Sequence, residues 1–282
     1  MLLNLTDGQG NSAKISTDGA ELKSLKIGGQ ELIWQGSPDY WSGSSPFLFP
    51  IASNVRNDTV YIEGKPYTLR QHGFASRLPW AITSQSADSA AFLLTETQET
   101  LAAYPFLFAL QADYILRDGA LELTLTVSNR DNREMPYCLG THPAFNVPFT
   151  DRPEGDFSQY QVIFEQPEEN SCPLYNGKLR QIDVDKRESF LSDERTLPLD
   201  YAVFDRVDTV IFDRLNSKKV TLTDTVTEKQ VVLAYKNFDY IAFWTPHAPF
   251  LCMEPWQGLS ACSDEDDNFL SKRGVTVLKP GE

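Results

Sequence analysis

The feature that most constrains the fold of this chain is a long series of short, strand-like runs separated by turn residues. Between residues 13 and 34, alternating apolar and polar positions are interrupted by Gly28-Gly29, which is typical of a β-meander. Asp118-Gly119 is a strong hairpin signal that joins the runs 108–116 and 121–128. Helical periodicity over eleven or more residues is scarce. The pattern therefore predicts an all-β fold.

Further runs with strand character recur along the chain. They cover residues 59–62, 66–69, 80–84, 90–95, 135–139, 160–164, 209–212, 219–222, 230–235, 240–244, 250–253 and 275–278. Roughly fifteen short strands with almost no helix imply a large antiparallel β-sandwich. The pattern is looser from 146 to 198, where we expect one strand and a long loop over 151–156. No shift in composition marks a linker, so we expect a single domain over residues 1–282.

Two segments between these runs are expected to be irregular. Residues 37–41 are predicted to form one helical turn. In the segment 45–58, Pro46 and Pro50 flank an aromatic pair, and proline cannot donate a hydrogen bond to a sheet. This segment is therefore expected to line a pocket or cap a barrel rather than to join a sheet.

Composition narrows the class of partner. The net charge of −14 argues against nucleic acid and anionic membranes, which bind clustered Lys and Arg, and favours a neutral small molecule. The N-terminus lacks the basic and apolar regions of a signal peptide, and no stretch approaches a transmembrane span, so we expect a cytoplasmic protein. The four cysteines form no Cys-x-x-Cys pair, which argues against a structural zinc site. Cys138 and Cys252 are expected to be small buried side chains within strands.

Three stretches contain the strongest acid and base candidates. Glu254 ends the apolar run 250–253 and precedes Pro255, so it either faces water at an edge strand or has a task that keeps a carboxylate there. His142 precedes Pro143, which restrains the histidine backbone to an extended conformation. His72 alone is weak evidence for a site. His247 lies between two prolines in a loop and is expected to face solvent.

The motifs around these residues resemble the aldose 1-epimerase (galactose mutarotase) family, and within it the branch of LacX-like proteins. They are Asn54-Val-Arg56-Asn, Gln71-His72-Gly73-Phe74, Gly140-Thr-His142-Pro-Ala-Phe145-Asn and Met253-Glu254-Pro255-Trp256. The resemblance extends from about Ile15 to the C-terminal strand. It implies a β-supersandwich fold, a sugar substrate, and reversible interconversion of the α and β anomers of an aldose with no metal or cofactor.

The resemblance also implies roles for individual residues. Glu254 matches the general base, His142 the general acid, and His72 and Arg56 the substrate-binding residues. The family's sugar-binding aspartate falls in the stretch 204–211, where Asp208, before a predicted strand, is preferred over Asp205. Proline after His142 and Pro-Trp after Glu254 depart from the galactose mutarotases proper, which affects the expected substrate more than the chemistry.

These residue types suit the opening of a sugar ring. One group takes the proton of the anomeric hydroxyl while another protonates the ring oxygen, and the roles reverse on reclosure. We expect His72, His142, Asp208 and Glu254 to line one open pocket with Arg56 at its wall. Nearby acid should hold the pKa of His142 up, so that Glu254 sets the acidic limb of activity and His142 the basic limb. Phe47, Phe74, Phe145 and Trp256 either offer the sugar an apolar face or belong to the core.

Three other functions remain open at this point. A hexose 6-phosphate would need basic groups such as Arg56, Arg70 and Arg77 at the pocket, and the acidic run 264–267, expected to be a solvated loop, would oppose an anion nearby. A non-catalytic carbohydrate-binding β-sandwich would need the aromatic residues but not the acid/base pair. A glycoside hydrolase would need two carboxylates, for example Glu254 with Asp208.

Overall fold

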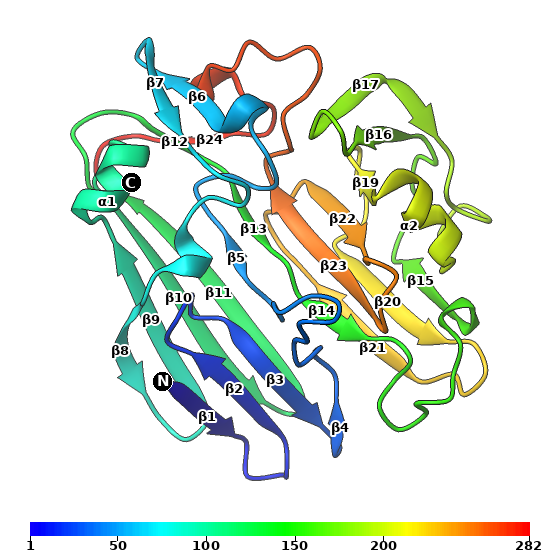
Figure 1. Cartoon of the computed structure of the whole chain (residues 1–282). Coiled ribbons are helices and arrows are strands. Elements are labelled where there is room, and N and C mark those ends of the chain that lie inside the picture. Colours follow the sequence, from blue (N-terminus) through cyan, green and yellow to red (C-terminus); the bar gives the residue numbers. More distant parts are fainter.

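Antiparallel strands dominate the computed structural model, which describes all 282 residues (Figure 1). The largest sheet has eight strands, and it holds the strands that flank His142 and contain Glu254. These strands are β5 (Phe47–Leu48), β13 (Leu139–Thr141), β14 (Ala144–Asn146), β16 (Cys172–Asn176), β17 (Gln181–Glu188), β19 (Thr209–Phe212), β22 (Tyr240–Trp244) and β23 (Phe250–Gln257). Their order is β17-β16-β19-β22-β23-β13-β5, and β14 also pairs with β23.

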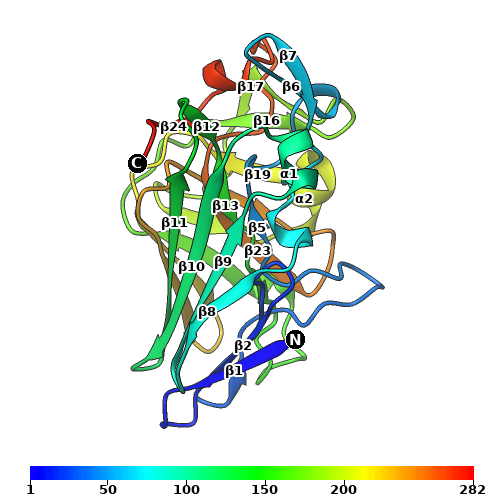
Figure 2. The same ribbon diagram turned by 90° about the vertical axis from the view of Figure 1, so that its left-hand side faces the viewer.

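A four-stranded sheet of long strands lies beside the large sheet, and Figure 2 shows it facing the viewer. It runs β11-β10-β9-β8, with bounds β8 (Ala81–Gln85), β9 (Ser89–Thr95), β10 (Phe108–Arg117) and β11 (Ala120–Asn129). The N-terminal sheet contains β1 (Leu2–Thr6), β2 (Ser12–Ser16), β3 (Leu22–Ile27) and β4 (Gln30–Glu31).

The remaining strands form one further four-stranded sheet and two pairs. The sheet runs β18-β15-β20-β21, with bounds β15 (Tyr160–Phe164), β18 (Thr196–Pro198), β20 (Lys219–Asp224) and β21 (Gln230–Ala234). The pairs are β6 (Thr59–Ile62) with β7 (Lys65–Thr68) and β12 (Met135–Tyr137) with β24 (Thr276–Leu278). Helices are short: α1 (Gln98–Ala103), α2 (Tyr201–Val207), and the 3₁₀ turns η1 (Arg56–Asp58), η2 (Ala75–Arg77), η3 (Phe157–Gln159) and η4 (Phe269–Ser271). None is long and apolar enough to span a bilayer.

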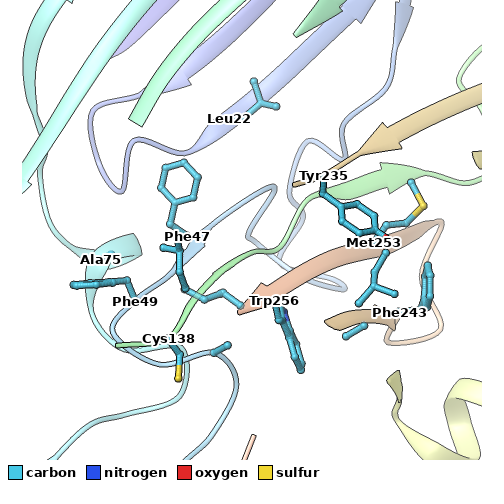
Figure 3. Packing of buried hydrophobic residues seen from close by; sticks show 14 of the residues in the cluster. Leu22, Phe47, Phe49, Ala75, Cys138, Tyr235, Phe243, Met253 and Trp256 are labelled. Atoms are coloured by element: carbon cyan, nitrogen blue, oxygen red, sulfur yellow. The ribbon is translucent and has the colours of Figure 1, made fainter. Parts of the chain in front are cut away.

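The core follows from the period of two in the strands. Along β10, Phe108, Leu110, Ala112, Tyr114 and Leu116 are buried and the residues between them are less so, because successive side chains point to opposite faces. Such faces build one cluster of 62 buried hydrophobic residues that extends through several sheets. Figure 3 shows part of it around β5 and β23. The predicted all-β antiparallel fold is confirmed.

Four local predictions need correction. Residues 37–41 form a turn closed by a bridge between Ser37 and Trp41, not a helix. Phe47–Leu48 joins the large sheet, though as an edge strand, where the missing proline donors cost least. The stretch 146–198 contains more strand than expected, namely β16, β17 and β18. The helices α1 and α2 were not expected, because each is too short to show helical periodicity.

Candidate active site

The site is built at an interruption in the pairing of β23. Strand β13 pairs with β23 at Gln257 and Trp256, and β14 pairs with it at Cys252, Leu251 and Phe250. Between the two pairings the chain leaves the ladder at His142-Pro143, which faces the middle of β23. The interruption therefore brings the His142 side chain beside the central residues of β23.

Strand β23 continues through Pro255 instead of ending at Glu254, as the sequence suggested. The N–H of Met253 bonds to the carbonyl of Pro143, and position 255 faces the same edge because backbone N–H groups alternate along a strand. A donor at 255 would point into the interruption, so proline is tolerated there in a central strand. Glu254 is thereby placed inside the sheet, where it is 1% exposed.

His142 and Glu254 form a buried pair. The Nε2 atom of His142 lies 3.3 Å from Oε2 of Glu254, and His142 is 7% exposed. The indole N–H of Trp256 donates to the same carboxyl oxygen at 3.2 Å. The neighbour of Glu254 across the sheet on β22 is Ala242, which has a small side chain without a polar group. The Nδ1 atom of His142 has no hydrogen-bond partner, so it is the free polar atom of the pair.

Burial determines the protonation of this pair. Loss of solvation, with a smaller effect of the Asp208 charge, raises the pKa of Glu254 well above its ordinary value. Burial also lowers the pKa of His142 well below its ordinary value, and the neighbouring His72 adds to this. The expectation that nearby acid raises the histidine pKa is therefore wrong. The pair favours a neutral carboxylic acid beside a neutral imidazole.

His72 lies edge-on to His142, with ring centroids 5.4 Å apart. Its Nδ1 accepts the backbone N–H of Ser53 at 3.2 Å, so a neutral ring carries its proton on Nε2. Burial, with the charges of Arg77 and Arg180, lowers the pKa of His72 to about 3. His72 is therefore a neutral ring of fixed tautomer that can donate a hydrogen bond.

The turn that holds His72 depends on Gly73. Its φ is +68°, and a Cβ atom there would lie 2.1 Å from the carbonyl oxygen of Phe49. We expect Gly73→Ala to destabilise the fold by about 3 kcal/mol or more, since the backbone must shift. Gly64 is the matched control: its φ is +74° and a Cβ would meet open space, so Gly64→Ala should cost only about 1–2 kcal/mol. Urea unfolding measures both, and equal losses would contradict the steric argument.

Trp256 acts on Glu254 through its N–H. Because this donor stabilises the carboxylate form, Trp256→Phe should raise the pKa of Glu254 further and slow proton transfer about tenfold. The measurement is the pH profile of kcat. With the pKa of Glu254 raised and that of His142 lowered, loss of the Glu254 proton sets the basic limb, which should move to higher pH. A variant with a lower rate but an unmoved limb would show that Trp256 acts only through packing.

The two aspartate candidates are separated by the structure. Asp205 pairs with His247 at 3.1 Å on the surface, and His247 is exposed as predicted. Asp208 is the single residue between α2 and β19, with φ of 63°. Its charge contributes to the raised pKa of Glu254, so Asp208 is the aspartate near the pair.

Arg56 does not join the pair. Its guanidinium donates to the carbonyls of Cys262 and Glu265 and lies 3.3 Å from Asp267. It makes no hydrogen bond or ion pair with His72, His142, Asp208 or Glu254, so its predicted sugar-binding role stays a prediction without support from its contacts. The acidic run 264–267 is more than a solvated loop, because two more of its carboxylates form ion pairs, Glu265 with Lys272 and Asp264 with Arg273.

Another part of the same motif does approach the site. Asn54 is fully buried, donates to the hydroxyl of Tyr175 at 2.8 Å and accepts from Arg180. Burial raises the pKa of Tyr175 and the Asp208 charge adds to this, whereas burial lowers the pKa of His72 and the Arg180 charge contributes. Asn54 thus connects two side chains near the pair. Sequence reasoning missed Tyr175 and Arg180, because they lie in the stretch where no regular pattern was visible.

The aromatic groups around His142 also differ from those expected. Trp41 stacks on the imidazole with ring centroids 4.9 Å apart and planes at 29°, and Trp244 lies edge-on at 5.6 Å. Phe47 and Phe145 instead belong to the main core, at 0% and 6% exposure. Trp41 is only half-buried. His142 therefore lies against two indole rings, and the open pocket expected around His72, His142, Asp208 and Glu254 stays a prediction.

A large cavity lies on the other side of the same sheet. A space of about 940 Å³ is lined by β11, by residues 233–239 and by Pro255 and Gln257. Since side chains alternate along β23, these two residues face away from Glu254. The cavity therefore lies on the opposite face of the sheet from the His142–Glu254 pair.

Comparisons with known proteins agree on one family. A family model described as aldose 1-epimerase matches residues 1–275. The plasmid-encoded protein LacX of Lactococcus lactis subsp. lactis is 32% identical over 279 residues, which cover 95% of this chain and 92% of LacX.

Two solved structures are similar over the whole chain. A galactose mutarotase-like protein from Lactobacillus casei ATCC 334 has 29% identity and a TM-score of 0.91, covering 100% of this chain and 96% of that one. A galactose mutarotase related enzyme from Lactobacillus acidophilus has 27% identity and a TM-score of 0.92, covering 100% and 94%.

Proposed function

This chain belongs to the aldose 1-epimerase family, as its motifs predicted, and on that premise we propose that it interconverts the α and β anomers of an aldose. The observation that carries the proposal is the buried His142–Glu254 pair, with Nε2 and Oε2 3.3 Å apart. Ring opening needs a base for the anomeric hydroxyl and an acid for the ring oxygen. An imidazole beside a carboxyl group supplies both.

The two proton transfers of the reaction can be assigned to Glu254 and His142. Glu254 as a carboxylate takes the anomeric proton, and His142 as an imidazolium gives a proton to the ring oxygen. The pair is then a carboxylic acid beside a neutral imidazole, which is the form that burial favours. After rotation about C1–C2, His142 removes the proton from O5 and Glu254 returns one to O1. The buried pair thus favours the protonation state that accompanies the open-chain sugar.

Two neighbouring residues suit the binding of sugar hydroxyls. His72 presents an N–H donor of fixed tautomer, because its other nitrogen is occupied by Ser53. Asp208 provides carboxylate acceptors at the start of β19. Because Trp41 stacks on His142, a sugar that reaches His142 must displace this indole or slide beside it. Sugar binding should therefore change tryptophan fluorescence.

Polarimetry of freshly dissolved α-anomers tests the proposed activity. We expect at least one common aldose to approach its equilibrium rotation faster with the protein than without it. A protein that binds sugars, seen as a change in tryptophan fluorescence, but accelerates none would be a non-catalytic carbohydrate-binding sandwich. Release of reducing sugar from glycosides would instead indicate hydrolysis.

A hexose 6-phosphate is the second candidate substrate, and Arg77 is the observation that favours it. The Arg77 guanidinium bonds to the carbonyls of Gly73 and Gln71 but to no carboxylate, so its charge near His72 is not neutralised. Arg70 lies near enough to affect the pKa of Arg77. If the substrate is phosphorylated, Arg77→Gln should raise KM for the 6-phosphate and leave KM for the free sugar unchanged.

A further inference from the structure

Besides the pair, one more side chain with metal-binding chemistry lies in this site. Cys252 is two residues before Glu254 on β23, so both side chains point to the same face of the sheet. A ring nitrogen of His142, Sγ of Cys252 and a carboxylate oxygen of Glu254 all lie within 4.8 Å of one another. No other group of three such donors occurs in the protein. The three donors form a ligand set that the proposed sugar chemistry does not use in full.

We propose that His142, Cys252 and Glu254 bind a divalent zinc ion, which silences the acid/base pair by occupying both of its members. Thiolate, imidazole and carboxylate together suit zinc and not the hard cations magnesium and calcium. Ligand distances of about 2.0–2.3 Å place donors about 3.3–3.7 Å apart in a tetrahedral site. The Nε2–Oε2 distance is already 3.3 Å, so mainly Cys252 must move closer.

Charge balance supports the site. The thiol of Cys252 and the carboxyl group of Glu254 would each release a proton to solvent, and imidazole binds as the neutral ring. One dication with two monoanionic ligands gives a buried unit of zero net charge, so the metal avoids the cost of isolated buried charge. Three protein ligands leave a fourth position open.

Two observations concern the access and the freedom of the ligands. His142 is the only one of the three with measurable exposure above 1%, at 7%, so an incoming ion meets it first. Its Nδ1 has no hydrogen-bond partner, which leaves the ring free to reorient without breaking a bond there. Cys252 belongs to a small apolar cluster with Phe250 and Ala144, and its thiol makes no hydrogen bond that would hold it away from a metal.

Cobalt substitution tests the site without any measurement of turnover. One equivalent of Co²⁺ added to the wild-type protein should give a thiolate-to-cobalt charge-transfer band, and one equivalent of Zn²⁺ should remove it. Cys252→Ala should lose the band. Cys262→Ala is the matched control, since Cys262 is also buried beside an acid, Glu265, but has no imidazole near it. Absence of the band in the wild type, or its survival in Cys252→Ala, would overturn the proposal.

A second experiment measures whether Zn²⁺ inhibits the proposed activity. Zn²⁺ should inhibit mutarotation by the wild-type protein, and Cys252→Ala should keep the metal-free rate while needing at least about tenfold more Zn²⁺ for half inhibition. Inhibition that is equal in both proteins would place the zinc elsewhere. If Cys252→Ala fails to fold, Cys252→Val keeps the volume and serves in its place. The cobalt band does not depend on turnover, so a protein without mutarotase activity would still decide the metal proposal.

Discussion

Glu254→Gln is expected to lower the mutarotation rate by about 10²-fold or more while the fold and sugar binding persist. Glutamine keeps the shape of the side chain and can still accept the indole N–H of Trp256, but it cannot take a proton. Burial already favours an uncharged group at this position, so the replacement adds no unpaired charge. The rate is measured by polarimetry, binding by tryptophan fluorescence and folding by circular dichroism.

Glu168→Gln is the control for this variant. Glu168 is also buried, at 7% exposure, and accepts the backbone N–H groups of Asn216 and Ser217 at 2.8 and 2.7 Å. Its replacement should lower stability by about 1–3 kcal/mol, because charge-assisted bonds are lost, without changing the rate per folded molecule. Near-normal turnover of Glu254→Gln would remove Glu254 from the mechanism.

The fold could be predicted where local signals dominate. The hairpin at Asp118-Gly119 was visible because its flanking strands alternate strictly and the turn has the preferred residues. The strands β16 and β17 were not visible, since their pairing shifts register between Pro173 and Leu174 and few of their residues are fully buried. A bulged, half-buried hairpin carries little periodicity, so only its tertiary contacts reveal it.

The candidate site could be predicted as a set of residues more readily than as a geometry. Short motifs identify His72, His142 and Glu254 as candidates. The interruption at His142-Pro143 depends on which strands pair with β23, and the local sequence does not determine that pairing. The same limit applies to Trp41. It lies about a hundred residues before His142, and nothing near it in the sequence indicates that its ring stacks on the imidazole.

The expected pKa shift of His142 is wrong for a related reason. Reference pKa values of about 4.3 for Glu and 6.5 for His describe groups in water, and sequence motifs say little about solvation. The prediction placed an acid beside His142, which was right for Glu254. It did not foresee that both groups are nearly fully buried. Desolvation then opposes the charged form of each group, and it outweighs the attraction between them in setting both pKa directions.

His142→Asn should lower the rate by about 10²–10⁴-fold, because asparagine can hydrogen-bond the ring oxygen but cannot transfer a proton to it. The pH profile of kcat/KM carries the more specific test. The active pair holds one proton in total, which can sit on either group. Adding a second proton charges the imidazole, and burial moves that acidic limb below the ordinary histidine value. Losing the last proton charges the carboxyl group, and burial moves that basic limb above the ordinary glutamate value.

The wild-type profile should therefore be a plateau between two limbs, and these limbs are assigned in the reverse of the order expected from the sequence. His142→Asn should remove the acidic limb and leave the basic one, whereas Glu254→Gln should remove the basic limb. His72 cannot replace the lost acid, because its pKa of about 3 keeps it neutral across this range. If His142→Asn instead removed the basic limb, the pair would work as a buried ion pair, and mutual attraction rather than desolvation would govern its protonation.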